Sequence, residues 1–231
     1  MKRTLGMTIH KEGRKILLGL FFILVLINGI VWILFGHLFF MPLFVITTIL
    51  FLFFTNFFRS PKRVSKAGPM DIMAPADGKV VVIEKTFEGC LLNEERIQLS
   101  IFMSIFNVHA NWYPFEGRVV HYSHQNGNFN AAYLPKSSIE NERSTVLLES
   151  AQTGKTVLIR QVAGALARRI VTYAYTNKKA HLNEHLGFIK FGSRVDVFLP
   201  LEDVEILVKP GDKTIGNKTI IARWKEKPAA D

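Results

Sequence analysis

The feature that most constrains this chain is a long stretch without charge near its N-terminus. Residues 16–58 contain no Asp, Glu, Lys or Arg, and His37 is their only titratable side chain. These 43 residues are about twice the ~20 apolar residues that cross a bilayer as one helix. The Gly36–His37 pair interrupts the run. The stretch therefore predicts a helical hairpin of two spans, 16–34 and 38–58, and not a signal peptide, whose apolar region is shorter.

The charged residues on either side of this stretch set its expected orientation. Basic side chains flank the hairpin and are absent from its turn: Lys2, Arg3, Lys11, Arg14 and Lys15 before it, and Arg59, Lys62, Arg63 and Lys66 after it. By the positive-inside rule both ends, and with them the rest of the chain, then lie on the cytoplasmic face of the membrane. A re-entrant or interfacial hairpin is the alternative, because Pro42 interrupts the second span.

The formal net charge of +10 suits either nucleic acid or an anionic membrane surface. The positions of the basic residues favour a membrane surface, because the most clustered of them flank the hydrophobic stretch, where anionic head groups lie. We therefore expect no nucleic-acid partner. The single cysteine, Cys90, excludes an internal disulfide framework.

The rest of the chain predicts a mainly β (α+β) catalytic domain of short strands. After a basic N-terminus (1–15) and the hairpin (16–58), a Pro/Gly/Lys-rich linker (59–70) leads into a domain over 71–231. Alternating β-branched runs predict strands at 79–84, 97–103, 117–122, 145–149, 156–162, 194–199, 204–208 and 219–223. An imperfect apolar face predicts one helix over 165–175, and the polar segment 127–143 is typical of a long loop.

Four short stretches could carry chemistry, and each also has an ordinary structural interpretation. Asp77 stands in PADG, a usual turn before a strand, and His109 stands in a strand-like run. Arg143 ends ENER, which alone indicates a solvated turn. In GFIKFGSRVDVFLP, two apolar runs flank Gly192 and Ser193, where a glycine usually marks a β-bulge or tight turn.

Together these stretches resemble the phosphatidylserine decarboxylase family in its short, self-processing, pyruvoyl-dependent form. In order, the motifs that carry the resemblance are FFRSPKR, PADGKV, FNVHANWYPFEGRV, GNFNAA, ENER, QVAGALARRI and GFIKFGSRVD. They cover nearly the whole chain after residue 57. Any one of them is weak evidence, but the ordered set is highly specific.

The resemblance implies that the protein cuts its own peptide bond between Gly192 and Ser193, leaving a β chain and an α chain that stay associated. Ser193 becomes a covalent pyruvoyl group, and no metal is needed. That group forms a Schiff base with phosphatidylserine in the membrane, and CO2 and phosphatidylethanolamine are released. His109 is then the base for self-cleavage and Asp77 the group that orients it, by the logic of Ser-His-Asp triads. Arg143 is a weak candidate for binding the substrate.

The apolar stretch and its basic flanks predict a bacterial cytoplasmic membrane as the location, and a homo-oligomer is compatible with the sequence. One departure concerns Phe106, since the longer bacterial branch of the family carries a second histidine at this place. We therefore expect His109 to act in both self-cleavage and decarboxylation. Two alternatives stay open, namely a pyruvoyl decarboxylase of another amino lipid or amino acid, and a non-enzymatic membrane-anchored adaptor rich in β-structure.

Overall fold

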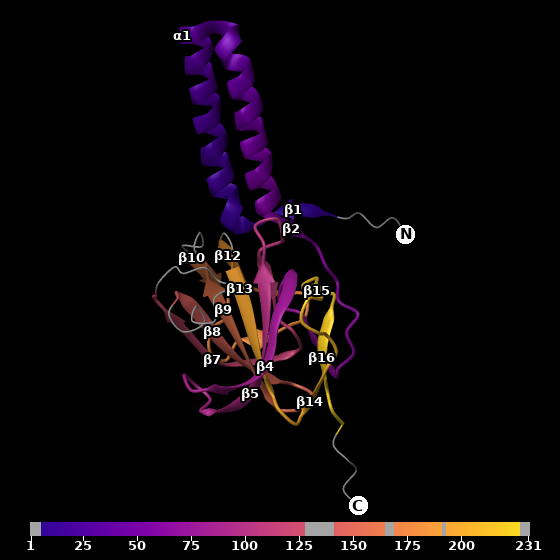
Figure 1. Ribbon diagram of the computed structural model, residues 1–231. Coiled ribbons are helices and arrows are strands. Elements are labelled where there is room, and N and C mark those ends of the chain that lie inside the picture. The colour runs from indigo at the N-terminus through magenta and orange to yellow at the C-terminus, as the bar shows by residue number, and fades with distance from the viewer. Residues whose placement is uncertain (1–5, 128–140, 165–168, 191–192, 227–231) are drawn as a thin grey trace, which may run out of the picture. The chain divides into compact units, whose positions relative to one another are not determined.

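A computed structural model of the chain describes residues 6–127, 141–164, 169–190 and 193–226. The chain divides into two compact units, Met1–Lys62 and Arg63–Asp231. The first is mainly helical and the second mainly β, which confirms the predicted fold class. Figure 1 shows the elements of each unit.

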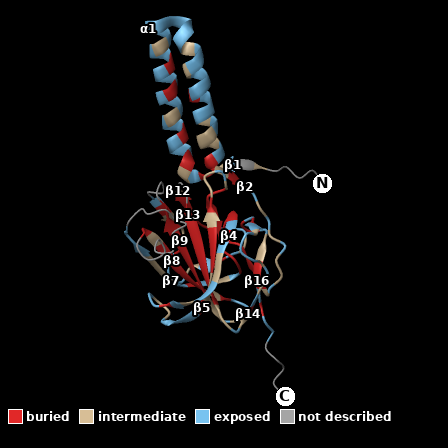
Figure 2. Cartoon of the chain, in the orientation of Figure 1, coloured by how far each residue is buried: buried red, intermediate tan, exposed pale blue. Residues whose placement is uncertain are grey.

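The first unit is built around α1 (Lys11–Phe57), whose two helical arms are joined at Gly36. Gly36 has φ 70° and ψ −170°, a conformation in which a side chain would be strained. The chain turns back at this residue, so the arms run antiparallel (Figure 1). The turn that the sequence predicts at Gly36–His37 is confirmed. By length and composition α1 can cross a membrane, and most of its large apolar side chains are exposed (Figure 2).

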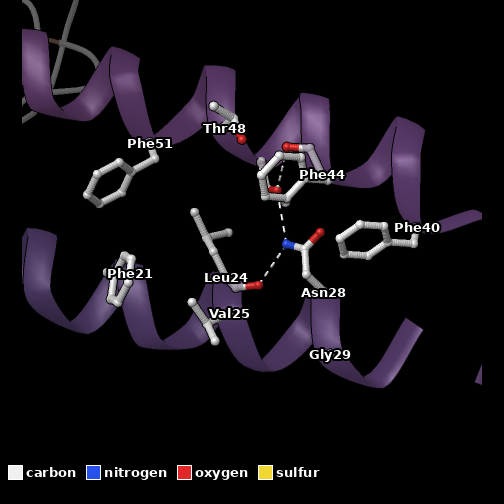
Figure 3. A pocket seen from close by; sticks show the side chains of 10 residues that line it. Phe21, Leu24, Val25, Asn28, Gly29, Phe40, Phe44, Thr48 and Phe51 are labelled. Carbon is white, nitrogen blue, oxygen red and sulfur yellow. Dashed lines mark hydrogen bonds between the residues drawn. The ribbon is translucent and has the colours of Figure 1, made fainter. Parts of the chain in front are cut away.

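A polar contact joins the two arms inside this apolar hairpin (Figure 3). The Asn28 side-chain amide donates to the Leu24 carbonyl at 2.7 Å and to Thr47 Oγ1 of the other arm at 3.0 Å. The ring centroids of Phe21 and Phe51, one on each arm, lie 5.9 Å apart. The hydrogen bond between Asn28 and Thr47 therefore ties the two arms together at this level. A hollow of about 420 Å³ lies between them, and it is lined by Phe21, Leu24, Val25, Asn28, Gly29, Phe40, Phe44, Thr47, Thr48 and Phe51.

The open end of the hairpin is closed by a short antiparallel pair, β1 (Met7–Ile9) and β2 (Arg59–Pro61). His10 caps α1 by accepting a hydrogen bond from the Glu12 backbone N–H at 3.4 Å. Its own N–H donates to the Phe58 carbonyl at 2.9 Å. The two ends of the hairpin are thus tied together.

The second unit contains a large antiparallel sheet of eight strands. Their spatial order is β11-β7-β8-β9-β13-β5-β4-β15. In chain order they are β4 (Gly78–Glu88), β5 (Glu94–Met103), β7 (Gly117–Gln125), β8 (Arg143–Ser150), β9 (Thr156–Ala163), β11 (Lys179–Ala180), β13 (Ser193–Pro200) and β15 (Lys213–Thr214). Figure 2 shows that the central strands of this sheet are largely buried.

Two three-stranded sheets complete the unit, with the orders β10-β12-β6 and β14-β16-β3. Their strands are β3 (Asp71–Met73), β6 (Ala110–Trp112), β10 (Arg169–Thr172), β12 (His185–Lys190), β14 (Val204–Ile206) and β16 (Ile220–Trp224). Apolar side chains from all three sheets form one core, with Val195 and Val197 of β13 among its members together with Leu186 of β12 and Ile221 of β16.

The opposite face of the large sheet buries charged side chains beside a small apolar cluster of Leu147, Leu158 and Phe198. The Arg160 guanidinium lies 2.6 Å from the Glu88 carboxylate, and Arg194 Nε lies 2.8 Å from Asp196 Oδ1. All four residues are buried. Burial alone would raise the pKa of Glu88, but the backbone N–H of Leu92 and the Arg160 side chain lower it below its ordinary value. Both faces of β13 are therefore closed to solvent, one by the main apolar core and the other by paired charges together with the Phe198 cluster.

The sequence-based strand predictions are largely confirmed, but the predicted helix over 165–175 is wrong. Residues 165–168 lie outside the described part of the chain, and Arg169–Thr172 form strand β10, paired with β12. Ile170, Val171 and Thr172 are β-branched and fit a pleated surface better than a helix. Most of the predicted loop, residues 128–140, also lies outside the described residues.

Candidate functional site

Ser193 stands where the chain passes from one sheet to another. β12 ends at Lys190 in the three-stranded sheet, and β13 begins at Ser193 in the centre of the eight-stranded sheet. Gly192 lies outside the described residues. The two apolar runs seen in the sequence are therefore separate strands with different partners, not one strand with a bulge.

The Ser193 side chain is fully buried on the core face of the large sheet. In register it pairs with Met103 of β5 on one side and with Ala163 of β9 on the other. Its hydroxyl donates to the Met103 sulfur at 3.3 Å, and the Asn111 amide reaches the same sulfur at 3.7 Å. A thioether sulfur is only a weak acceptor, so the hydroxyl is held without a strong hydrogen bond.

Two connections in the chain place His109 near Ser193. β5 ends at Met103, opposite Ser193, and a turn over residues 104–107 then leads to His109. On its other side, the backbone N–H of Ile189 donates to the His109 carbonyl at 3.2 Å, and Ile189 belongs to β12, which leads to Ser193. The sequence-predicted base and nucleophile therefore both lie near the C-terminal end of β12, His109 beside Ile189 and Ser193 three residues after Lys190. His109 is fully buried.

A backbone contact sets the tautomer of the His109 ring. His109 Nδ1 lies 3.0 Å from the carbonyl oxygen of Asn107. A carbonyl can only accept, so Nδ1 carries the hydrogen, and in a neutral imidazole Nε2 is then the basic nitrogen. Asn107 was missed by the sequence reasoning, because a backbone carbonyl leaves no residue-type signal.

Asp77 is a buried carboxylate with two described partners. The Arg63 guanidinium binds both of its oxygens, with 2.8 Å between Nη2 and Oδ2, and the Gly216 backbone N–H donates to Oδ1 at 2.8 Å. The Arg63 guanidinium also lies over the Trp112 ring, 4.6 Å from its centroid. Trp112 is on β6, three residues after His109. The direct orienting role of Asp77 toward His109 remains a prediction.

Arg143 opens β8, where it pairs with Val162 of β9. Ser193 pairs with the next residue, Ala163, and successive residues of a strand point to opposite faces. Arg143 therefore projects from the charged face, away from the Ser193 hydroxyl. Burial and then the neighbouring Arg160 charge lower the pKa of Arg143. Its role in substrate binding remains a prediction.

A buried polar network lies beside Ser193, on the same face of the sheet. Gln161 donates to Asn111 at 2.7 Å and accepts from Thr172 at 2.8 Å, and Thr172 also lies 2.7 Å from the Ser144 hydroxyl. These bonds join the strand that follows His109 to the strands that surround Ser193. Sequence reasoning missed this network, although polar residues at inward strand positions were a usable signal.

Metal ligands are a separate question. Among the described residues, no group of three or more His, Cys, Asp or Glu side chains is arranged to hold a metal ion. His181 contacts Glu116 at 3.0 Å, and the His185 ring packs edge-on against Trp112.

The chain was compared with known protein families and with curated proteins. A model of the phosphatidylserine decarboxylase family matches residues 50–222. A protein named "Phosphatidylserine decarboxylase proenzyme" from Parabacteroides distasonis is 53% identical over 223 residues, covering 94% of this chain and 99% of the relative. One of the same name from Bacteroides thetaiotaomicron is 48% identical, covering 97% and 99%. A third, from Porphyromonas gingivalis, is 56% identical, covering 79% and 82%.

The family match includes the motifs by which the sequence resembles this family, and the three matches to relatives extend over most of each relative. With a family match that spans both the His109 segment and Ser193, the chain belongs to the phosphatidylserine decarboxylase family.

Proposed function

We propose that this chain is a proenzyme that cuts its own backbone between Gly192 and Ser193 and then decarboxylates phosphatidylserine to phosphatidylethanolamine and CO2. Membership of the family and the names of the relatives support the reaction. The observation that carries the proposal is the position of Ser193. It is a buried serine at the first residue of a central strand, where the chain leaves one sheet and enters another.

A cut at this junction would leave both new ends held in place. β12 pairs with β10 and β6, whereas β13 pairs with β9 and β5. None of these pairings depends on the bond between Gly192 and Ser193. The β chain, ending at Gly192, and the α chain, beginning at the former Ser193, would therefore remain one folded unit without rearrangement.

His109 supplies the base that self-cleavage needs, because a serine hydroxyl is a poor nucleophile until its proton is removed. With Nδ1–H directed to the Asn107 carbonyl, Nε2 is the nitrogen that accepts this proton. The Ser193 oxygen bonds to the Gly192 carbonyl carbon, the C–N bond breaks, and the nitrogen takes up a proton, which leaves an ester. Loss of the Ser193 α-proton then expels the Gly192 carboxylate. The dehydroalanine that remains reacts with water to give a pyruvoyl group and ammonia.

The residues around Ser193 fit such a group. A pyruvoyl group at this position would supply the carbonyl with which the substrate amine condenses, and would provide the electron sink for the loss of CO2. Met103 and Ala163 flank the position with apolar atoms, so the group would lie in largely apolar surroundings. His109 can deliver the proton that replaces CO2, and we assign it both stages because Phe106 stands where the longer branch has a second histidine.

The substrate is a membrane lipid, and the hairpin would anchor the chain in the membrane that contains this lipid. We assign α1 to the bacterial cytoplasmic membrane, with both of its ends and the β-rich unit on the cytoplasmic side. The basic flanks and the uncharged turn at Gly36 support this orientation.

This topology is testable by labelling single cysteines in intact cells. In a Cys90→Ser background, Lys66→Cys should stay unlabelled by a membrane-impermeant thiol reagent added outside the cytoplasmic membrane. The matched variant His37→Cys, in the turn between the arms, should be labelled. A re-entrant hairpin predicts that neither cysteine is labelled, and labelling at residue 66 alone would reverse the orientation.

The reaction itself is tested with the purified full chain. We expect an intact mass that resolves into two pieces split after residue 192, the second with a blocked N-terminus. The same preparation should release CO2 from phosphatidylserine in mixed vesicles and none from free serine, because the anchored site receives its substrate from the membrane. A single uncut chain, or CO2 from free serine at a similar rate, would contradict the proposal.

A further inference from the structure

A short turn immediately before His109 exposes a large aromatic side chain. Phe106 is 64% exposed, although it lies three residues from a fully buried histidine. The turn is well held: the Ser104 N–H donates to Asn107 Oδ1 at 2.9 Å, the Asn107 N–H donates to the Ser104 carbonyl at 2.8 Å, and the Phe106 N–H donates to Ser104 Oγ at 3.4 Å. The exposure of Phe106 is therefore a consequence of a defined backbone.

Single exposed apolar residues are common, so the exposure of Phe106 indicates a function only if its neighbours support one. Ile189 of β12 bonds to the His109 carbonyl, so the next residue, Lys190, lies beside the turn. Lys190 pairs in turn with Arg169 of β10. Phe106, Lys190 and Arg169, which we call the rim, thus follow one end of the three-stranded sheet. This is the end at which β12 leads into Ser193.

The rim combines an aromatic side chain with positive charge. Arg169 is exposed and Lys190 is half-buried. The turn 104–108 and the strands β10 and β12 contain no Asp or Glu. An aromatic ring flanked by basic groups is the combination that binds the interface of an anionic bilayer, where the ring enters the head-group region and the cations face lipid phosphates.

We propose that the rim docks onto the surface of an anionic lipid bilayer and so brings the end of β12 that leads into Ser193 next to its substrate. The proposal rests on the proposed function, since a lipid substrate keeps its acyl chains in the bilayer while its amine must reach Ser193. One aromatic and two basic side chains also offer far less area than the roughly 800 Å² per partner of a stable protein interface. A bilayer therefore fits the rim better than a second copy of the chain.

The docking is measured by fluorescence, which does not depend on activity. In the full-length Cys90→Ser chain, Phe106→Cys is labelled with an environment-sensitive fluorophore and reconstituted into phosphatidylcholine–phosphatidylglycerol vesicles. Some of the lipids carry a nitroxide quencher near the head-group end of an acyl chain. The matched control is Gln152→Cys, an exposed residue in the β8–β9 turn at the far end of these strands from Ser193.

We expect strong quenching at residue 106 and little at residue 152. Equal quenching at the two positions would overturn the proposal, even if the enzyme is active. Energy transfer between labelled copies without quenching at residue 106 would also overturn it, in favour of a protein contact. If the wild-type chain shows no decarboxylase activity, the proposed function fails, but the quenching comparison still decides the docking.

A kinetic comparison tests the basic part of the rim. Arg169→Ala should raise the apparent KM for phosphatidylserine, expressed as surface fraction, by about fivefold in anionic vesicles, which corresponds to the ~1 kcal/mol that one basic residue gains near such a surface. The rise should vanish in high salt, because added ions screen this attraction. Lys85→Ala, which removes an exposed lysine nearer the far end of the sheet, should leave KM unchanged. A salt-independent rise in KM would assign Arg169 a structural role instead. An equal rise in Lys85→Ala would assign the effect to the overall charge of the protein and would contradict docking by the rim.

Discussion

Ser193→Ala is expected to yield a single uncut chain without decarboxylase activity. Alanine has no hydroxyl to attack the Gly192 carbonyl, so neither the ester nor the group derived from it can form. The fold should survive, because alanine fits the buried position between Met103 and Ala163, and the hydrogen bond that the Ser193 hydroxyl makes to the Met103 sulfur is weak. Intact mass and denaturing electrophoresis give the cleavage state, and CO2 release gives the activity.

Ser144→Ala is the matched control for this variant. Ser144 is another fully buried serine on the same face of the sheet, and its hydroxyl bonds to Thr172 instead of facing the junction. It should lose some stability but still mature into two chains. Two fragments split after residue 192 in Ser193→Ala, or a complete loss of cleavage in Ser144→Ala with a native melting transition, would contradict the assignment of Ser193.

His109→Ala is expected to slow self-cleavage by at least about a hundredfold, the low end of what general-base catalysis contributes. The variant removes the nitrogen that accepts the Ser193 proton. Self-cleavage occurs once per chain and has hours to finish, so a slow variant can still accumulate mature enzyme. The rate in a time course after synthesis is therefore the quantity to follow. Maturation at the wild-type rate would exclude His109 from self-cleavage.

Asp77→Asn and Arg63→Met separate two ways in which Asp77 could support His109. We expect Asp77→Asn to slow cleavage by at least about a hundredfold, as loss of the carboxylate does in a triad. If Asp77 acts on His109 itself, Arg63→Met should cleave at a near wild-type rate. If Asp77 acts by holding Arg63 over Trp112, both variants should be equally slow. Wild-type maturation of Asp77→Asn would leave Asp77 as a turn residue that anchors Arg63 and Gly216.

Local pattern was enough to predict the hairpin and the longer strands of this protein, but not short strands such as β3, β6, β11 and β15. The uncharged run predicted the hairpin and its turn at Gly36, because hydrocarbon accepts only apolar, internally bonded segments. Alternation of apolar residues predicted the long strands. It failed at Arg169–Thr172, where a short segment offers too few residues to distinguish a helical from a strand period and pairing with β12 decides the outcome.

The sequence by itself determined the apolar hairpin, the β-rich class and the residue types proposed for self-cleavage, since each depends on neighbours in the chain or on an ordered set of motifs. Only the tertiary structure decided which partners these residues have. Asp77 meets Gly216, 139 residues away, and Ser193 meets Met103, 90 residues away. A strand's two-residue period fixes which side chains share a face, but the choice of neighbouring strand is made by the packing of the whole core. The passage from β12 to β13, and with it a junction that can be cut without separating either strand from its sheet, follows from that packing.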